Sequence, residues 1–150
     1  MHSLNFAKEI MAITPYIHGE FFKKHPKVLM KGRITFPQMA IMDILRIKKG
    51  CKMSDISTVM GVTKSAVTGI VDRMIKLAII KRVRLKNDRR VIKIGLTPKG
   101  RSLSNTLYTF RIRMIDRLFA HVNEKERLQY ITILKKLRDA IVAKSRTKVP

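Results

Sequence analysis

Apolar residues recur at intervals of three and four along most of the chain, which is the period of one face of an α-helix. The pattern predicts helices over residues 4–24, 36–47 and 124–143, and a long helix that begins at Thr97-Pro98. The apolar stripe of the helix over residues 4–24 consists of Phe6, Ile10, Ile13, Ile17 and Phe21. In the helix that begins at Thr97-Pro98 the stripe is Leu103, Leu107, Phe110, Met114 and Leu118, and in residues 124–143 it is Leu128, Ile131, Leu134, Leu137 and Ile141. Such a helix cannot bury its stripe alone, so each must pack on another helix or on a second subunit.

Two shorter helices are expected between residues 53 and 76. In the first, Ile56, Val59 and Met60 form the predicted buried face, and Gly61 suits the left-handed position that ends a helix. Thr63 can cap the second helix. The second helix has an apolar stripe and an opposite polar face, which consist of Val67, Ile70, Val71, Met74 and Ile75 and of Lys64, Ser65, Thr68 and Asp72. This arrangement is typical of a helix-turn-helix, whose second helix enters the major groove of DNA.

The next segment alternates apolar and basic residues, over residues 80–86 and 90–96, around Asn87-Asp88-Arg89. This pattern predicts a β-hairpin with a polar tip. Its cations, opposed by Asp88 alone, are Lys81, Arg82, Arg84, Lys86, Arg89, Arg90 and Lys93. A solvated hairpin without a partner could show the same pattern, but so dense a charge repels itself unless phosphates lie opposite. The predicted fold is mainly α: a winged helix-turn-helix with a small two-stranded β wing and long N- and C-terminal dimerisation helices.

A more specific pattern spans the end of the hairpin. Asp88 and Arg90 are separated by one residue. Five residues lie between Arg90 and Leu96-Thr97, and two more lie between Thr97 and Gly100. The chain also contains the runs Val67-Thr68, Val71-Asp72-Arg73-Met74 and Ile79-Ile80-Lys81-Arg82. With these features the sequence resembles the multiple antibiotic resistance regulator (MarR) family. The resemblance implies a homodimer on double-stranded DNA, with the recognition helix in the major groove and a wing arginine in the adjacent minor groove. Many members release DNA when a small molecule or an oxidant acts.

DNA contacts are expected on the second short helix and on the wing. Lys64, Ser65 and Thr68 are the candidates for base edges, because residues at the start of a recognition helix reach the groove floor. Arg90 is expected in the minor groove, where Asp88 would hold its orientation. The complete set of candidate DNA-binding residues is Lys64, Ser65, Thr68, Arg73, Lys81, Arg84, Lys86, Asp88, Arg89 and Arg90.

The sequence departs from the family pattern at two positions. Where many members carry an arginine after the recognition-helix threonine, this chain has Gly69, which offers no side chain for base readout and lowers helix stability by about 1 kcal/mol relative to alanine. Where the family usually has a glycine that ends the recognition helix, this chain has Ala78. Either the helix ends differently, or Ala78 is held at positive φ at an energetic cost.

The expected organisation is one structural domain with two regions. Residues 33–97 form the winged helix-turn-helix DNA-binding region, and residues 1–32 and 98–150 form a helical dimerisation region. The two terminal regions carry long amphipathic helices with little chain left to cover them, which favours a homodimer. The dimer helices and the DNA-reading unit would then be joined only through the helix within residues 33–47 and the Thr97-Pro98 junction.

The charge of the chain indicates a polyanionic partner. Its 33 Lys and Arg against 10 Asp and Glu give a formal net charge of +23. The excess is not confined to residues 33–97, since residues 99–150 hold 13 Lys and Arg against 4 Asp and Glu. A sequence-tolerant basic protein that coats the nucleoid or RNA is therefore the alternative to a sequence-specific transcriptional repressor. The salt dependence and the specificity ratio on duplex DNA distinguish the two.

Other chemistry finds little support in the sequence. The four histidines are scattered, and a lone Cys51 excludes an internal disulfide, so we expect no catalytic residue, metal site or cofactor. Lysines beside Cys51 would lower its thiol pKa if it were exposed, but a buried small apolar residue is the favoured interpretation. No apolar run is long enough to cross a membrane and no signal peptide is present, which predicts a cytoplasmic protein.

An effector pocket is the least specific expectation. His18 and Phe22 lie on the first helix near other aromatic residues, where the resemblance implies a pocket, and Met42 is a flexible residue of the next predicted helix. The abundance of cations favours an anionic aromatic compound as the effector. A histidine at a protein surface and a methionine in a core are also ordinary, so these three residues have a structural interpretation as well.

Overall fold

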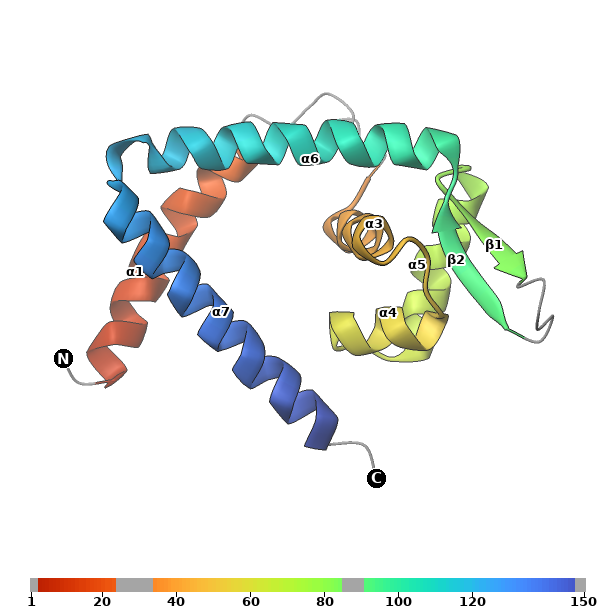
Figure 1. Ribbon diagram of the computed structural model, residues 1–150, viewed down its shortest axis with the longest axis horizontal. Coiled ribbons are helices and arrows are strands. Elements are labelled where there is room, and N and C mark those ends of the chain that lie inside the picture. Colours follow the sequence, from red (N-terminus) through yellow and green to blue (C-terminus); the bar gives the residue numbers. More distant parts are fainter. Residues whose placement is uncertain (1–2, 24–33, 85–90, 148–150) are drawn as a thin grey trace. The chain divides into compact units, whose positions relative to one another are not determined.

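The computed structural model describes residues 3–23, 34–84 and 91–147, and is mainly helical with one antiparallel hairpin (Figure 1). The chain divides into two compact units, Met1–Phe36 and Pro37–Pro150. Its described elements are α1 (Ser3–Lys23), α3 (Phe36–Lys48), α4 (Met53–Met60), α5 (Lys64–Lys76), β1 (Ile80–Arg84), β2 (Ile92–Leu96), α6 (Pro98–Leu118), η1 (Phe119–His121) and α7 (Glu124–Thr147). The predicted winged helix-turn-helix class is confirmed, and the predicted helices occur within a few residues of their expected bounds.

Helix α1 forms most of the described part of the first unit and contains Pro15 within its length. Four residues of its predicted stripe, Phe6, Ile10, Ile13 and Ile17, are 45–58% exposed. The fifth, Phe21, has a side chain outside the described residues. Exposure of this apolar stripe costs free energy in water unless another surface covers it.

The core of the second unit is built from one face of each short helix, the hairpin and the first half of α6. Its fully buried apolar side chains include Ile41, Met42, Leu45, Ile56, Val67, Val71, Met74, Ile80, Ile94 and Leu107. The predicted stripe of α5 therefore faces inward at Val67, Val71 and Met74, and that of α6 is buried at Leu107 and Met114. The recognition helix α5 packs on this core through its three buried residues.

The predicted buried face of α4 is wrong at one residue. Val59 is 57% exposed, whereas Ser57 is buried and donates its hydroxyl to the Ser54 carbonyl at 2.9 Å. In an eight-residue helix only one narrow face can pack, and here that face passes through Ile56 and Ser57, which places Val59 at its outer edge. Gly61 ends the helix at a φ of 66°, as its sequence position predicted.

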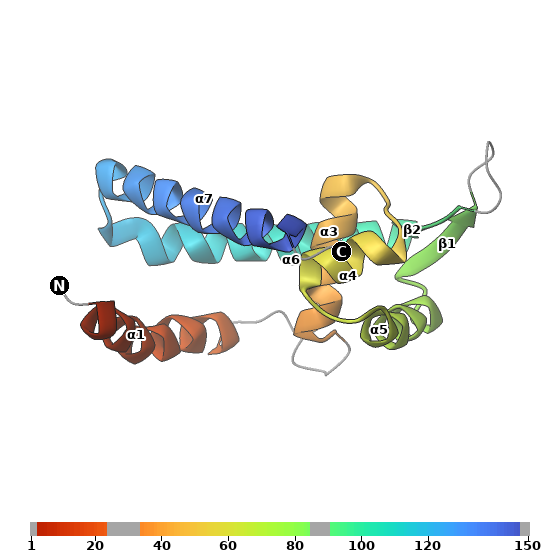
Figure 2. The ribbon, with the colours of Figure 1, turned by 90° about the horizontal axis from the view of Figure 1, so that it is seen from below.

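The hairpin is in regular antiparallel register, from Ile80 opposite Leu96 to Arg84 opposite Ile92. Cys51 adds a short bridge on the other side of β2: its amide donates to the Ile94 carbonyl at 3.1 Å, and the Ile94 amide donates back at 2.8 Å. This pairing fixes the base of the wing to the loop before α4. The hairpin projects beyond α5 at the N-terminal end of α6 (Figure 2).

A compact junction joins α5, β1 and α6, and it explains the Leu-Thr-x-x-Gly part of the sequence pattern. Thr97 caps α6 by accepting the Gly100 amide at 2.9 Å, and its hydroxyl also donates to the Ala78 carbonyl at 2.7 Å. A Cβ on Gly100 would lie 1.8 Å from the Ile79 carbonyl oxygen, so only glycine allows this approach. Ala78 has a φ of 56°, which decides between the two alternatives: the residue is held in the left-handed region.

Two contacts between α3 and α6 lie farther along α6. The Arg111 guanidinium donates to both Asp43 carboxylate oxygens, at 2.5 and 2.6 Å. The Arg46 guanidinium lies 3.5 Å from the centre of the Tyr108 ring, a cation–π geometry. The long helix is therefore fixed to the helix-turn-helix at its N-terminal junction and again about midway along its length.

Helix α7 begins at a capping box formed by Asn123 and Glu126. The Asn123 amide donates to Glu126 Oε2 and the Glu126 amide to Asn123 Oδ1, both at 3.0 Å. Arg127 also donates to the carbonyls of Phe119 and Val122, which ties the helix start to η1. The predicted stripe of α7 is 46–65% exposed and consists of Leu128, Ile131, Leu134, Leu137 and Ile141.

Candidate nucleic-acid interface

The start of α5 presents short polar and cationic side chains to solvent. Thr63 caps the helix by accepting the Ala66 amide at 3.2 Å, as predicted. Lys64, Ser65 and Thr68 are all exposed, so the three candidate base-reading residues lie on the side opposite the core. Thr68 donates its hydroxyl to the Lys64 carbonyl at 2.8 Å, and the oxygen retains acceptor capacity for a base donor. A helix N-terminus also favours nearby phosphate through its dipole.

The second half of α5 carries two consecutive charged residues, Asp72 and Arg73, which make different contacts. The exposed Arg73 folds back along the helix, with Nε donating to the Gly69 carbonyl at 3.2 Å. Asp72 accepts from Arg82 of β1 at 2.7 Å. This ion pair links the recognition helix to the wing, although both side chains are about half exposed and the pair contributes little to stability.

The described part of the wing presents cations outward. Lys81 and Arg84 on β1 are exposed, and within the described residues neither forms an ion pair with a carboxylate. Four candidate residues, Lys86, Asp88, Arg89 and Arg90, lie outside the described residues, so their predicted roles stay predictions. Arg82, which is not among the candidate DNA-binding residues, is paired with Asp72, so part of its charge is neutralised within the protein.

The carboxylates of Asp55 and Asp72 are bonded to groups of the DNA-reading unit itself, which leaves the outer face of that unit basic. Asp55 accepts the Lys52 amide at 2.9 Å in the first turn of α4, and Asp72 is paired with Arg82. Exposed Lys64 and Lys81 therefore meet no nearby competing carboxylate among the described residues. A surface of this kind attracts the phosphates of nucleic acid and makes binding depend on salt.

Cys51 is buried, with 3% of its surface exposed. Burial, and secondarily the charge of Asp55, raise the pKa of the thiol, while Lys48 and Lys93 act in the opposite direction. The interpretation of Cys51 as a buried small apolar residue is confirmed. Among the described residues, no three His, Cys, Asp or Glu side chains are grouped to hold a metal ion.

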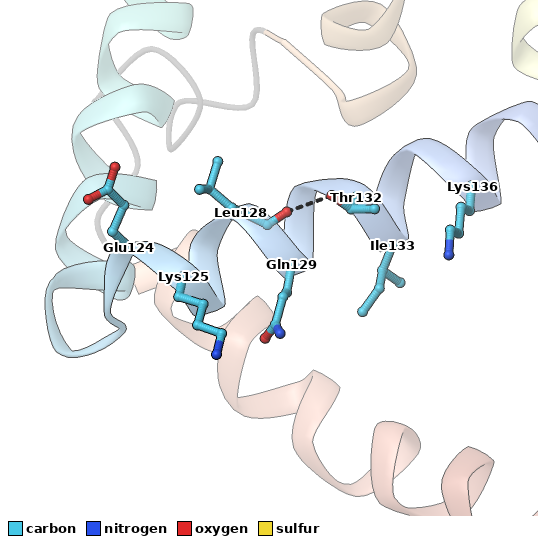
Figure 3. A pocket seen from close by; sticks show the side chains of 7 residues that line it. All are labelled: Glu124, Lys125, Leu128, Gln129, Thr132, Ile133 and Lys136. Atoms are coloured by element: carbon cyan, nitrogen blue, oxygen red, sulfur yellow. Dashed lines mark hydrogen bonds between the residues drawn. The ribbon is translucent and has the colours of Figure 1, made fainter.

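The three candidate effector residues are placed differently. His18 is exposed on α1, Met42 is buried to 1% exposure in α3, and the Phe22 side chain lies outside the described residues. Their predicted association therefore stays a prediction. A separate cavity of about 740 Å³ runs along α7 and is lined by Glu124, Lys125, Leu128, Gln129, Thr132, Ile133 and Lys136 (Figure 3). Figure 3 shows these side chains spread along one helix, an open arrangement without convergent polar groups.

Among the described helices, none is both long enough and apolar enough to cross a membrane. The hydroxyls of Thr68 and Ser57 donate to backbone carbonyls of their own helices. The geometry is that of a binding surface. Its working parts are an exposed helix face and an adjacent basic hairpin.

Comparison with known proteins agrees with this geometry. A family model described as "MarR family" matches residues 34–92. The HTH-type transcriptional repressor MdtR of Bacillus subtilis (strain 168) is 32% identical over 123 residues, which cover 80% of this chain and 79% of MdtR. The HTH-type transcriptional regulator YfiV of the same organism is 34% identical over 79 residues, and that match spans only 49% of YfiV and 53% of this chain.

Solved structures share the fold over nearly the whole chain. A MarR family protein from Bacillus stearothermophilus superposes with a TM-score of 0.73 at 22% identity, covering 95% of this chain and 99% of that one. BpsR of Bordetella bronchiseptica, whose DNA binding is regulated by 6-hydroxynicotinic acid, superposes with a TM-score of 0.69 at 20% identity, covering 89% and 98%. With the MdtR match and the family model, these findings show that the chain belongs to the MarR family of transcriptional regulators.

Proposed function

We propose that the protein is a repressor that binds a palindromic operator as a homodimer and leaves it when a small anionic aromatic compound binds. Residues 33–97 would read the DNA, and residues 1–32 and 98–150 would form the dimer. The observation that carries the proposal is the exposed polar face of α5, with Lys64, Ser65 and Thr68, beside the basic strand β1. The relative MdtR is named a repressor, which supports the same direction of control.

The dimer is supported by exposed apolar residues on the terminal helices. Phe6, Ile10 and Ile13 of α1 are 47–58% exposed, and Leu128 and Leu137 of α7 are 59% and 55% exposed. Large exposed apolar faces on a folded chain mark interaction surfaces. In a two-fold dimer, two copies of α5 would reach successive major grooves, which matches a palindrome with half-sites about 10 bp apart or a multiple of that.

The test is selection of bound sites from random duplex DNA, followed by affinity measurements at fixed ionic strength. A repressor should enrich a two-fold symmetric site and bind it at least about a thousandfold more tightly than scrambled duplex. A protein that merely coats nucleic acid would enrich no symmetric site, and its affinity would follow salt alone on every sequence. Light scattering should give a dimer mass, and a monomer would contradict the proposal.

The effector part of the proposal has a separate test. BpsR responds to 6-hydroxynicotinic acid, an aromatic acid, and the strong positive charge of this chain also favours an anionic ligand. Hydroxybenzoate-like acids are titrated against the protein–operator complex at constant ionic strength, with non-aromatic acids as controls. A tenfold loss of DNA affinity requires a coupling free energy of only about 1.4 kcal/mol. Equal displacement by both groups of acids would reduce the effect to competition of anions for a basic surface.

A further inference from the structure

Gly69 occupies the middle of the exposed face of α5. Successive residues of an α-helix are about 100° apart, which places Gly69 roughly 165° from the centre of the buried face formed by Val67, Val71 and Met74. Ser65 precedes it by one turn and Arg73 follows it by one turn, and all three are exposed. The face that would meet DNA therefore has bare backbone at its centre.

Nothing inside the protein requires glycine at this position. A Cβ added to Gly69 would meet no atom within 4 Å, and its backbone is ordinary helix. Gly100 and Gly61 differ, because the first lies against the Ile79 carbonyl and the second has a φ of 66°. A glycine inside a helix is less stable than an alanine, and glycine is also the residue that lets backbone approach a ligand closely.

The open space beside the exposed Gly69 Cα, called the notch below, offers an apolar contact to a ligand. Its carbonyl is engaged by Arg73 Nε at 3.2 Å, and an amide in the helix interior is bonded within the helix. Asp72 on the next turn is paired with Arg82 and directed to the wing. The open neighbours that remain include the exposed Ala66 methyl group, so the space around the Gly69 Cα suits a small apolar group.

We propose that this notch receives the C5-methyl group of a thymine, which makes Gly69 a specificity-determining residue at one symmetric pair of operator positions. The inference rests on the proposed function, in which α5 is the recognition helix. In the major groove only thymine carries a methyl group, and proteins read it through apolar contact. A side chain at position 69 would occupy the space that the methyl group needs.

The experiment uses the operator selected by the wild-type protein, with each thymine pair replaced in turn by deoxyuridine, which lacks only the methyl group. For the wild type, one symmetric pair should weaken binding about fourfold per half-site. Gly69→Ala should bind the thymine operator about tenfold or more weakly, because the added methyl overpacks the contact. Deoxyuridine at that same pair should restore most of the lost affinity, since it returns the space.

In the DNA-free protein, Gly69→Ala should raise stability, although it lowers the affinity for the operator. Gly69→Ala should raise Tm by about 2–4 °C, because alanine favours the helix and its Cβ meets nothing. Thr58→Ala in α4 is the control: Thr58 is exposed and its hydroxyl donates to the Ser54 carbonyl within its own helix, so Tm should rise slightly while operator affinity stays unchanged. Together these outcomes separate contact with DNA from helix stability.

Two results would overturn the inference alone. One is Gly69→Ala binding the thymine operator as tightly as the wild type; the other is an affinity loss that deoxyuridine recovers at no symmetric pair. A wild-type protein that selects no symmetric site would defeat the proposed function and the inference together. The selection therefore distinguishes failure of the contact from failure of the recognition helix.

Discussion

Ala78 shows how the tertiary structure overrides a local backbone preference. A left-handed conformation costs a non-glycine residue about 1–2 kcal/mol, yet Ala78 adopts a φ of 56° directly after Leu77. The Thr97 hydroxyl holds the Ala78 carbonyl, and the Ala78 amide donates to the Ile75 carbonyl at 2.8 Å. From sequence this residue could be marked as unusual, but the choice between its two conformations depended on Thr97, which lies 19 residues away.

Ala78→Gly is expected to stabilise the protein by about 1 kcal/mol, because glycine relieves the left-handed strain at a smaller entropic cost. Thermal unfolding followed by circular dichroism should show Tm raised by about 2–4 °C at the same protein concentration. Gly61→Ala is the opposite control, since Gly61 has a φ of 66° and a Cβ there meets nothing within 4 Å. If Ala78→Gly left Tm unchanged or lowered it, the conformation assigned to Ala78 would be wrong.

Cys51 illustrates a case in which burial outweighs neighbouring charge. The sequence offered two interpretations, a thiol activated by lysines and a buried apolar residue. The structure buries the side chain and raises the thiol pKa mainly by removing it from water. A buried thiol with a raised pKa holds little thiolate at neutral pH, so the lysine-rich sequence around it does not create a reactive group.

Helices whose apolar residues repeat over several turns could be predicted from the sequence. The contacts between helices could not. The stripes of α5 and α6 repeat over several turns, and the structure buries Val67, Val71 and Met74 of the first and Leu107 and Met114 of the second. Helix α4 has only about two turns, so its apolar residues do not define the buried face closely. Val59 was predicted to be buried and is exposed. Asp43 and Arg111 are 68 residues apart, and no spacing rule connects residues at that separation.

The Asp43–Arg111 pair should contribute measurably to the attachment of α6 to α3. Its side chains are 27% and 22% exposed, and the guanidinium is bound at two oxygens. Asp43→Asn should lower the free energy of unfolding by about 1–3 kcal/mol, because it leaves a largely buried cation poorly paired. Chemical denaturation measures this loss.

The exposed pair Arg138–Asp139 provides the matched control for that change. Its side chains are 64% and 66% exposed, so Asp139→Asn should change stability by less than about 0.5 kcal/mol. Equal losses for Asp43→Asn and Asp139→Asn would show that burial of the first pair has no energetic consequence.

The wing should contain two kinds of DNA contact. Arg90→Ala should weaken operator binding sharply without unfolding the protein, because a narrow minor groove concentrates negative potential around an inserted arginine. The exposed Lys81 is expected to contact phosphate, so Lys81→Ala should weaken every duplex alike and reduce the salt slope by about one unit. Affinities at several salt concentrations on operator and scrambled DNA separate the two effects. Identical, sequence-independent losses for both variants would remove the distinction.

For the whole molecule, the sequence indicated both a DNA-reading surface and the need for a second subunit. The charge of +23 required a polyanion, and the apolar stripes of the terminal helices exceeded what one chain could cover. In the structure the α1 residues Phe6 to Ile17 of the stripe and the α7 stripe are exposed. The sequence could not specify which bases are read, because that depends on the fit of α5 to a groove that the chain does not contain.

The most direct test of the proposed mode of recognition is binding of the wild type and of Thr68→Ala to every single-base-pair variant of the selected operator. Thr68 is exposed and its hydroxyl bonds only within its own helix, so the substitution should leave the fold intact. Discrimination should fall by about 1–3 kcal/mol at one pair of positions related by two-fold symmetry, and remain elsewhere. A uniform loss at all positions, or a loss in one half-site only, would contradict recognition of a palindrome by two copies of α5.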